Sequence, residues 1–303
     1  MHPQAGTHSE PSIAAYLADI IAECGGAGRP LVSLILFGSA ATGGYVSATS
    51  DVDLLLVLND QTDAASCGQV RDRVTALEKR HGLAKRRSSR IGMVTHALAT
   101  FADRVTANVR TFFVCTRADL LSGTPGRILG LAPTQARFVD RIAIPSIVAS
   151  GRTVWGEPLL DRVPLPPIRR RDVAKAFFGL FNQALLSAAV YPLLPDATKY
   201  AMDALKRSVH SCYFCYHAQP APLWAEIEFF DRRYGPSPTL ARLIALRREY
   251  RPSFGFIVRC LATLAQLHLR TARDVPFPRH ARLGASVAAP DPHAPRRGRP
   301  NDR

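Results

Sequence analysis

The chain has 303 residues, of which 47% are hydrophobic and 21% charged, and its formal net charge is +15 at pH 7. These values are ordinary for a folded protein, and the length predicts about two domains. No stretch approaches the ~18 uninterrupted apolar residues that a membrane span needs. The longest candidate, 184–194, contains Pro192. The N-terminus lacks the pattern of a signal peptide, so we expect a cytoplasmic protein without a membrane partner.

Cysteine and charge placement narrow the class further. Six cysteines are scattered along the chain, which predicts reduced thiols instead of a disulfide scaffold. Positive charge is concentrated in 79–90, 169–171 and 276–303. Such runs attract nucleotides or nucleic acid, but they also occur as solvated faces of arginine-rich chains. Aromatic residues are not interleaved with the basic ones, so binding of nucleic acid is possible but not favoured.

The first half of the chain mixes helical and strand patterns. Apolar spacing predicts a helix over 11–24 that ends at Gly25. The run 31–37 has strand character, 38–50 is small and polar, and 51–58 predicts a second strand that is buried on both faces. The further predictions are a helix over 64–81, strands within 90–97 and 110–117, a helix over 133–150 and a short extended segment at 151–160.

The second half has a different pattern. A proline-rich connector, 161–168, is followed by helical spacing alone from 171 to 273, which predicts a bundle of four or five helices. Residues 276–303 hold six of the 23 prolines and predict a disordered tail. We therefore expect an α+β fold: a small mixed-sheet domain over 1–165, an all-helical bundle over 166–275 and a basic Pro/Arg-rich tail over 276–303.

The segment between the first two strands carries the chemistry. Gly38 allows a sharp turn and close approach of a ligand, and Ser39 can bind a phosphate oxygen. A helix starting after Ser39 would point its free N–H groups at an anion. Gly43 and Gly44 keep the following loop thin, and Ser50 precedes the next strand. Gly38, Ser39 and Ser50 are the predicted nucleotide-binding residues.

Asp51 and Asp53 open that second strand two residues apart, so both carboxylates should project from the same face. Their Cα atoms are then about 6.5 Å apart, a separation that lets two carboxylates share hard cations. Mg²⁺ takes one or two carboxylates and completes its shell with water and phosphate oxygens. Asp51 and Asp53 are therefore the predicted catalytic and metal-binding residues, with Mg²⁺ as cofactor and a nucleoside triphosphate such as ATP as substrate.

The ordered set GSAATGG…SDVDLLLVL resembles the signature of the DNA polymerase β-like nucleotidyltransferase superfamily. Within this superfamily, the motif is similar to those of antibiotic adenylyltransferases and bacterial minimal nucleotidyltransferases. The resemblance covers about residues 10–165 and implies transfer of a nucleoside monophosphate, AMP from ATP, to a hydroxyl of a small molecule or a protein. It also implies a helical second domain that closes over the nucleotide.

The sequence departs from that pattern at the third acid. Family members usually carry it on a later strand, where it completes the metal site or acts as general base. No residue of 91–98 is acidic, and His96 is the only titratable group there. Asp103 and Asp119 are substitutes from neighbouring turns. A catalytically weak or inactive nucleotide-binding regulatory protein of the same fold therefore stays as the alternative.

Two other groups have a structural and a functional interpretation. His210, Cys212, Cys215 and His217 look like a zinc site, but helical spacing sets Cys212 nearly opposite the histidines, which favours core packing. Lys199-Tyr200 and Lys206-Arg207 lie on one predicted helix, and a cation there could reach a triphosphate across a cleft, but surface charge on an amphipathic helix is the favoured interpretation.

Overall fold

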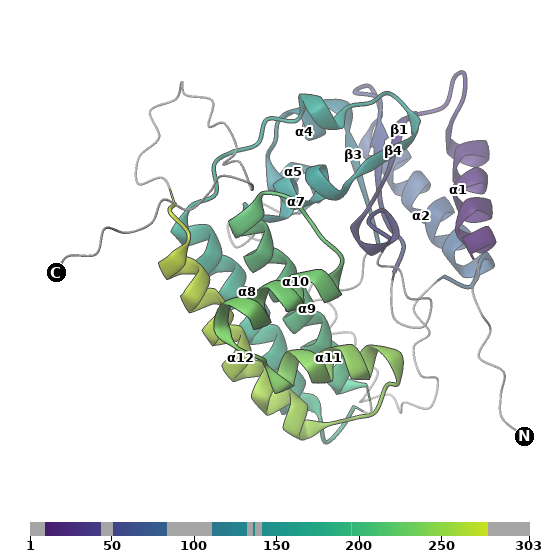
Figure 1. Cartoon of the computed structure of the whole chain (residues 1–303). Helices are drawn as coiled ribbons and strands as arrows, with labels where there is room; N and C mark the ends of the chain where they lie inside the picture. The colour runs from purple at the N-terminus through teal and green to yellow at the C-terminus, as the bar shows by residue number, and fades with distance from the viewer. Residues whose placement is uncertain are drawn as a thin grey trace, which may run out of the picture.

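The structure is a computed structural model, and it describes residues 10–43, 51–83, 111–131, 136, 141–194 and 196–277. Figure 1 shows a four-stranded sheet with helices on both sides, and a helical bundle next to it. The predicted α+β fold, with a mixed-sheet domain followed by helices, is confirmed. The strand predicted within 90–97 and almost all of the predicted tail lie outside the described residues.

The sheet has the order β3-β2-β1-β4. β1 (Leu31–Phe37) pairs antiparallel with β2 (Asp53–Leu58) and with β4 (Arg152–Gly156), while β2 pairs parallel with β3 (Phe112–Thr116). β3 and β4 confirm the strand predicted within 110–117 and the extended segment at 151–160. The two central strands are almost entirely buried, which explains their uninterrupted apolar runs.

Alternation along β1 and β2 divides the core between the two faces of the sheet. One face, which includes Leu34 and Leu54, packs against α1 (Glu10–Cys24) and α2 (Ala64–Arg80). The other, which includes Ile35 and Leu55, packs against helices that follow β3. Those helices are α4 (Arg117–Leu121), α5 (Pro125–Ile128) and α7 (Ala143–Ser150).

Five helices form the bundle, within the predicted range of four or five. They are α8 (Arg170–Val190), α9 (Ala197–His217), α10 (Leu223–Tyr234), α11 (Pro238–Arg248) and α12 (Phe254–Asp274). Their shared core includes Leu205, Phe230, Leu243 and Leu264. A short 3₁₀ turn, η2 (Leu160–Arg162), and an irregular segment at 163–169 precede α8. Ile142, just before α7, packs with Phe214 of α9 and so ties the bundle to the sheet.

α8 is long and apolar enough, by length and composition alone, to cross a membrane. Core helices of soluble proteins pass the same test, so the finding is weak evidence for a span. α8 packs against α9 and α12 and buries Leu180, Gln183 and Ala184 there. Its apolar character therefore serves the bundle core.

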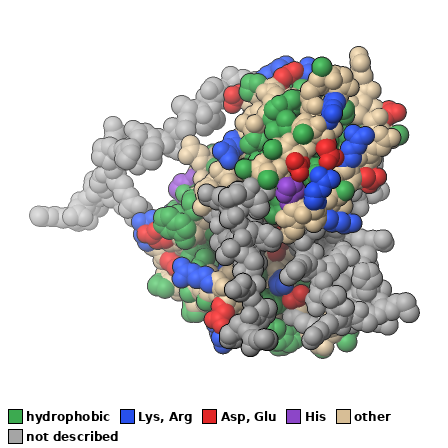
Figure 2. Space-filling view, turned by 90° about the vertical axis from the view of Figure 1, so that its right-hand side faces the viewer, with side chains coloured by type: hydrophobic (Ala, Val, Ile, Leu, Met, Phe, Trp, Pro, Cys, Tyr) green, Lys and Arg blue, Asp and Glu red, His purple; other side chains and the backbone are tan. Residues whose placement is uncertain are grey.

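The face of the molecule shown in Figure 2 carries charges of both signs, with Lys and Arg interspersed among Asp and Glu. Arg80, in the first basic run, lies 3.6 Å from both Asp19 and Glu23 of α1. The charge of Arg80 is thus partly offset within the protein. This agrees with the interpretation that a basic run can form a solvated face of an arginine-rich chain.

Candidate functional site

The β1–β2 ladder positions Asp53. Its last pair joins Phe37 to Asp53, so the chain leaves β1 at the point where β2 begins. Asp51 and Val52 precede β2 and belong to no regular element, which corrects the predicted strand start at Asp51. The strand begins two residues later because β1 ends at Phe37 and offers Asp51 no partner.

Gly38 follows β1 directly and lies against the Asp53 carboxylate. Its backbone has φ +69°, and a Cβ at this position would lie 2.5 Å from Asp53 Oδ2. Only glycine combines this left-handed backbone with so close an approach. The Gly38 amide lies 3.4 Å from Ser150 Oγ at the end of α7, and the Gly38 carbonyl accepts from Thr42. The turn is therefore held from two sides against Asp53.

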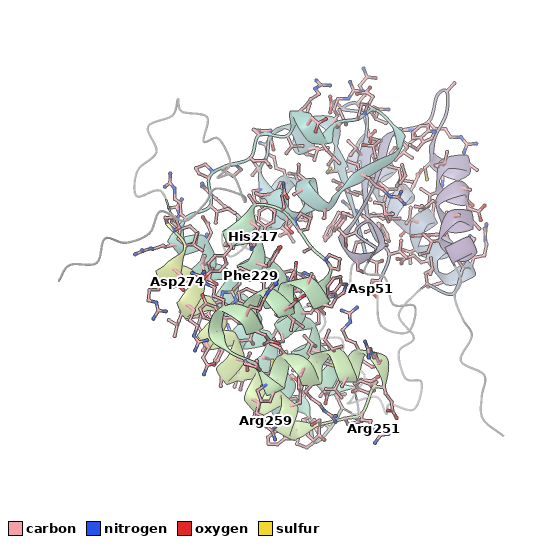
Figure 3. All side chains as sticks on the ribbon, viewed as in Figure 1. Asp51, His217, Phe229, Arg251, Arg259 and Asp274 are labelled. Atoms are coloured by element: carbon pink, nitrogen blue, oxygen red, sulfur yellow. The ribbon has the colours of Figure 1, made fainter. Side chains whose placement is uncertain are left out.

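Asp51 and Asp53 are both half-buried, whereas Val52 between them is 4% exposed and packs under α1 and α2. Because neighbouring side chains of an extended chain alternate, the two carboxylates are directed away from that core. Both also interact with other groups of the protein. Figure 3 places Asp51 where the end of the sheet meets the bundle.

The predicted nucleotide-binding residues have different outcomes. Ser39 lies in η1 (Gly38–Ala40), a single 3₁₀ turn, and is partly exposed. No helix follows within the described residues up to 43, and three residues of 3₁₀ helix are too short to supply a helix N-terminus for an anion. Ser50 lies outside the described residues.

Of the candidates for the third acid, Asp119 lies among the described residues. The segment 91–98, with His96, and Asp103 lie outside the described residues. Asp119 is described, and it forms a capping box with Thr116: its carboxylate lies 2.9 Å from the Thr116 hydroxyl. Thr116 is aligned with Leu58, the far end of β2. Five strand residues separate Leu58 from Asp53, about 16 Å at ~3.3 Å each. Asp119 is therefore not brought to Asp51 and Asp53.

Sequence reasoning missed two residues at this end of the sheet. Ser150 contacts the Gly38 amide, and Glu78 of α2 accepts from the Thr111 hydroxyl. The Thr111 carbonyl in turn accepts from Leu54 N at 2.9 Å. Neither contact leaves a signal in the sequence, because each joins residues that are distant along the chain.

Cations of the bundle surround Asp203. Its carboxylate lies 3.6 Å from Lys206 and 3.8 Å from Arg207, and it accepts from the Gln183 amide at 3.1 Å. Burial lowers the pKa of Arg247, and the Asp203 charge opposes that shift. Three cations of the bundle thus gather around the Asp203 carboxylate.

The residues with apparent zinc spacing have separate environments. His210 Nδ1 lies 2.5 Å from Glu226 Oε2, Cys212 is fully buried, and His217 stacks on Tyr213. Among the described residues, no group of three or more His, Cys, Asp or Glu side chains is placed to hold a metal ion. The pair of carboxylates at the start of β2 fits Mg²⁺ better than zinc, since Mg²⁺ takes few protein ligands and keeps water and phosphate oxygens.

The site is thus a mixed sheet in which the first carboxylate of β2, Asp53, lies against a glycine turn, with Asp51 two residues before it. Residues 19–103 match the family model described as a nucleotidyltransferase domain. The chain therefore contains a nucleotidyltransferase domain, whose matched range includes Gly38, Asp51 and Asp53.

Comparison with curated protein sequences gives no match. Among solved structures, the chain is similar to spectinomycin adenyltransferase AAD(9) from Enterococcus faecialis, which was crystallised with ATP and spectinomycin. The two share 11% identity with a TM-score of 0.46, over 86% of this chain and 97% of that chain. A likeness of this size carries no argument about substrate.

Proposed function

We propose that this protein transfers a nucleoside monophosphate, AMP from Mg²⁺–ATP, to a hydroxyl of a small molecule or a protein. The observation that carries the proposal is the approach of Gly38 to Asp53, which brings the backbone of a glycine turn against a half-buried carboxylate. The nucleotidyltransferase domain match over residues 19–103 supports the reaction class.

Each residue then has a defined task. Asp51 and Asp53 hold Mg²⁺, which when bound neutralises phosphate charge and favours in-line attack at the α-phosphorus. The Gly38–Ala40 turn lets the β- and γ-phosphates approach the backbone, and Ser39 and Ser50 donate hydroxyls to them. Ser150 fixes the turn by its contact with the Gly38 amide.

The bundle contributes positive charge. Lys206, Arg207 and Arg247 gather around the carboxylate of Asp203, and cations placed together attract a polyanion. Asp51 lies where the sheet meets the bundle (Figure 3). In this proposal, a triphosphate held by the carboxylates extends toward the cations of the bundle. This arrangement leaves the acceptor to bind on the bundle side.

The alternative is a nucleotide-binding regulatory protein of the same fold with little or no turnover. The involvement of Asp119 in a capping box favours it, because one substitute for the third acid is thereby removed. Loss of a general base costs ~10²–10⁴-fold in rate, so nucleotide binding would persist while transfer is lost.

Pyrophosphate release from Mg²⁺–ATP tests the two against each other, with a panel of hydroxyl acceptors that includes aminoglycosides and proteins. Calorimetric titration with Mg²⁺ and a non-hydrolysable ATP analogue measures binding in parallel. We expect Asp53→Asn to abolish release, and Asp72→Asn, an exposed carboxylate of α2, to leave it unchanged.

Three outcomes are distinct. Magnesium-dependent release that Asp53→Asn removes supports the transferase. Tight analogue binding that depends on Asp51 and Asp53, with no release for any acceptor, supports the regulatory alternative. Absence of analogue binding overturns both.

A further inference from the structure

The bundle contains a pocket that is separate from the site at the start of β2. Its volume is about 340 Å³, within the range of small-molecule sites. It lies at the end of the bundle where Figure 3 labels Arg259, well away from Asp51. The residues that line it are Pro238, Thr239, Arg242, Ser253, Phe256 and Arg259.

Two helices begin at this pocket. α11 and α12 are capped by Ser237 and Ser253, whose hydroxyls accept from the amides of Leu240 and Phe256. Pro238 has no N–H, so the first-turn amides without an intrahelical acceptor are those of Thr239 in α11 and of Phe254 and Gly255 in α12. Each helix start carries partial positive charge. Neither helix has an acidic residue in its first turn. The protein thus brings two positive helix ends together without a compensating carboxylate.

Two arginines add full charges to the same place. Arg242 and Arg259 lie in the second turns of α11 and α12, and helical side chains lean back toward the N-terminus, so both guanidiniums cover the first turns. Neither forms an ion pair with another described residue, and the lining contains no acid. Cations beside helix N-termini are unfavourable unless an anion lies between them.

The largely buried side chain of Thr239 provides an independent indication of a ligand. Thr239 is 7% exposed and lines the pocket. Its hydroxyl forms no hydrogen bond with any other described residue, although most buried side-chain polar groups have a partner. Because Thr239 lines the pocket, a group bound there would be within reach of this hydroxyl.

We propose that this pocket binds a phosphate group, free or as the monoester of a small molecule. Arg242 and Arg259 hold its oxygens, and the Thr239 hydroxyl and the first-turn amides of α11 and α12 donate further hydrogen bonds. Arginine forks match phosphate geometry, and phosphate is the anion that helix N-termini commonly bind. The ring of Phe256 and Pro238 leave apolar wall for an organic substituent.

Thermal unfolding of the full chain tests the proposal. Potassium phosphate and phenyl phosphate are titrated against potassium chloride at equal ionic strength, and ³¹P line width is followed below the unfolding temperature. We expect a saturable rise in Tm. Arg242→Gln and Arg259→Gln should each weaken binding about tenfold or more, since hydrogen bonds to charged groups are the strong ones. Thr239→Val should weaken it less.

Arg248→Gln is the matched control, because this exposed arginine lies in the last turn of the same helix α11. It should leave phosphate binding unchanged. The double variant Arg242→Gln/Arg259→Gln should unfold at the same or a higher temperature than the unmodified chain without phosphate, because two unfavourable charges are removed. The Asp53→Asn variant distinguishes phosphate binding in this pocket from phosphate binding at the proposed nucleotide site. Phosphate binding should persist in that variant.

The two probes distinguish free phosphate from a monoester as the preferred ligand. A rise in Tm that does not saturate, or that persists in the double variant, overturns the proposal. So does the absence of arginine-dependent broadening of both phosphorus signals. The line-width measurement on the single variants applies even if the double variant folds poorly.

Discussion

The backbone of Gly38 lies against the carboxylate of Asp53, so close that a Cβ on residue 38 would be 2.5 Å from Asp53 Oδ2. The two residues belong to the last paired position of β1 and β2 and the turn that follows it. Sheet register therefore sets the distance between the glycine turn and the acid.

The first prediction concerns this contact. Gly38→Ala must strain a left-handed backbone and displace the Asp53 carboxylate, so we expect Mg²⁺–ATP affinity to fall at least about tenfold. The strain itself costs roughly 1–2 kcal/mol of stability. Gly28→Ala is the control: φ is +75° there and nothing lies within 4 Å of the added Cβ. Denaturant unfolding of both variants measures the cost of the backbone strain. Calorimetric titration of both variants measures the effect on Mg²⁺–ATP affinity of displacing the Asp53 carboxylate. Equal nucleotide affinity of the two variants would contradict the assigned contact.

Asp119 is expected to be structural. Asp119→Ala removes the capping box at α4, which should lower the free energy of unfolding by about 1 kcal/mol. Pyrophosphate release, measured beside Asp72→Ala as an exposed-carboxylate control, should stay within twofold of the unmodified chain. A hundredfold loss of release would instead identify Asp119 as the general base.

Acid should destabilise the bundle through His268. Burial lowers the pKa of His268 to about 4, while the unfolded chain has the ordinary value near 6.5. Between those two values only the unfolded state binds the proton, so stability is complete above pH 6.5 and falls as the pH drops toward 4. The full loss is about 3 kcal/mol from this residue. Denaturant unfolding between pH 7.5 and 5 measures how the free energy of unfolding changes with pH. This free energy should fall less steeply with decreasing pH in His268→Gln than in the unmodified chain. The same pH dependence of the free energy of unfolding in His268→Gln and in the unmodified chain would be inconsistent with a buried neutral histidine.

The His210–Glu226 pair joins α9 to α10. Glu226 is 1% exposed, and His210 Nδ1 lies 2.5 Å from its carboxylate. His210→Ala leaves that carboxylate buried without its partner, and we expect a loss of about 2 kcal/mol at pH 7, less than for a fully buried pair. His210→Ala/Glu226→Gln should be less destabilised than the sum of the two single variants. A double-mutant cycle by denaturant unfolding measures the coupling, and additive effects would mean that the two side chains do not interact.

The local sequence determined the elements of this protein and the identity of its two acids. The apolar runs 31–37 and 51–58 predict buried strands because they are too short for typical helices, and the structure starts the second strand at Asp53. Helical spacing from 171 onward predicts the bundle. Gly38, Asp51 and Asp53 stand within twenty residues of one another, so the sequence alone predicts a joint role for them.

Only the tertiary structure decided which distant groups meet these residues. Strand register places Asp53 beside Gly38 and sets Asp119 at the opposite end of β2. Ser150, more than a hundred positions away, reaches the Gly38 amide because α7 packs on that face of the sheet. The arginine pocket arises in the same way, from the packing of α11 against α12. Strand and helix formation depends largely on neighbours in the sequence, so the sequence alone predicts these elements. Contacts between distant segments depend on the packing of the whole chain, so only the tertiary structure determines them.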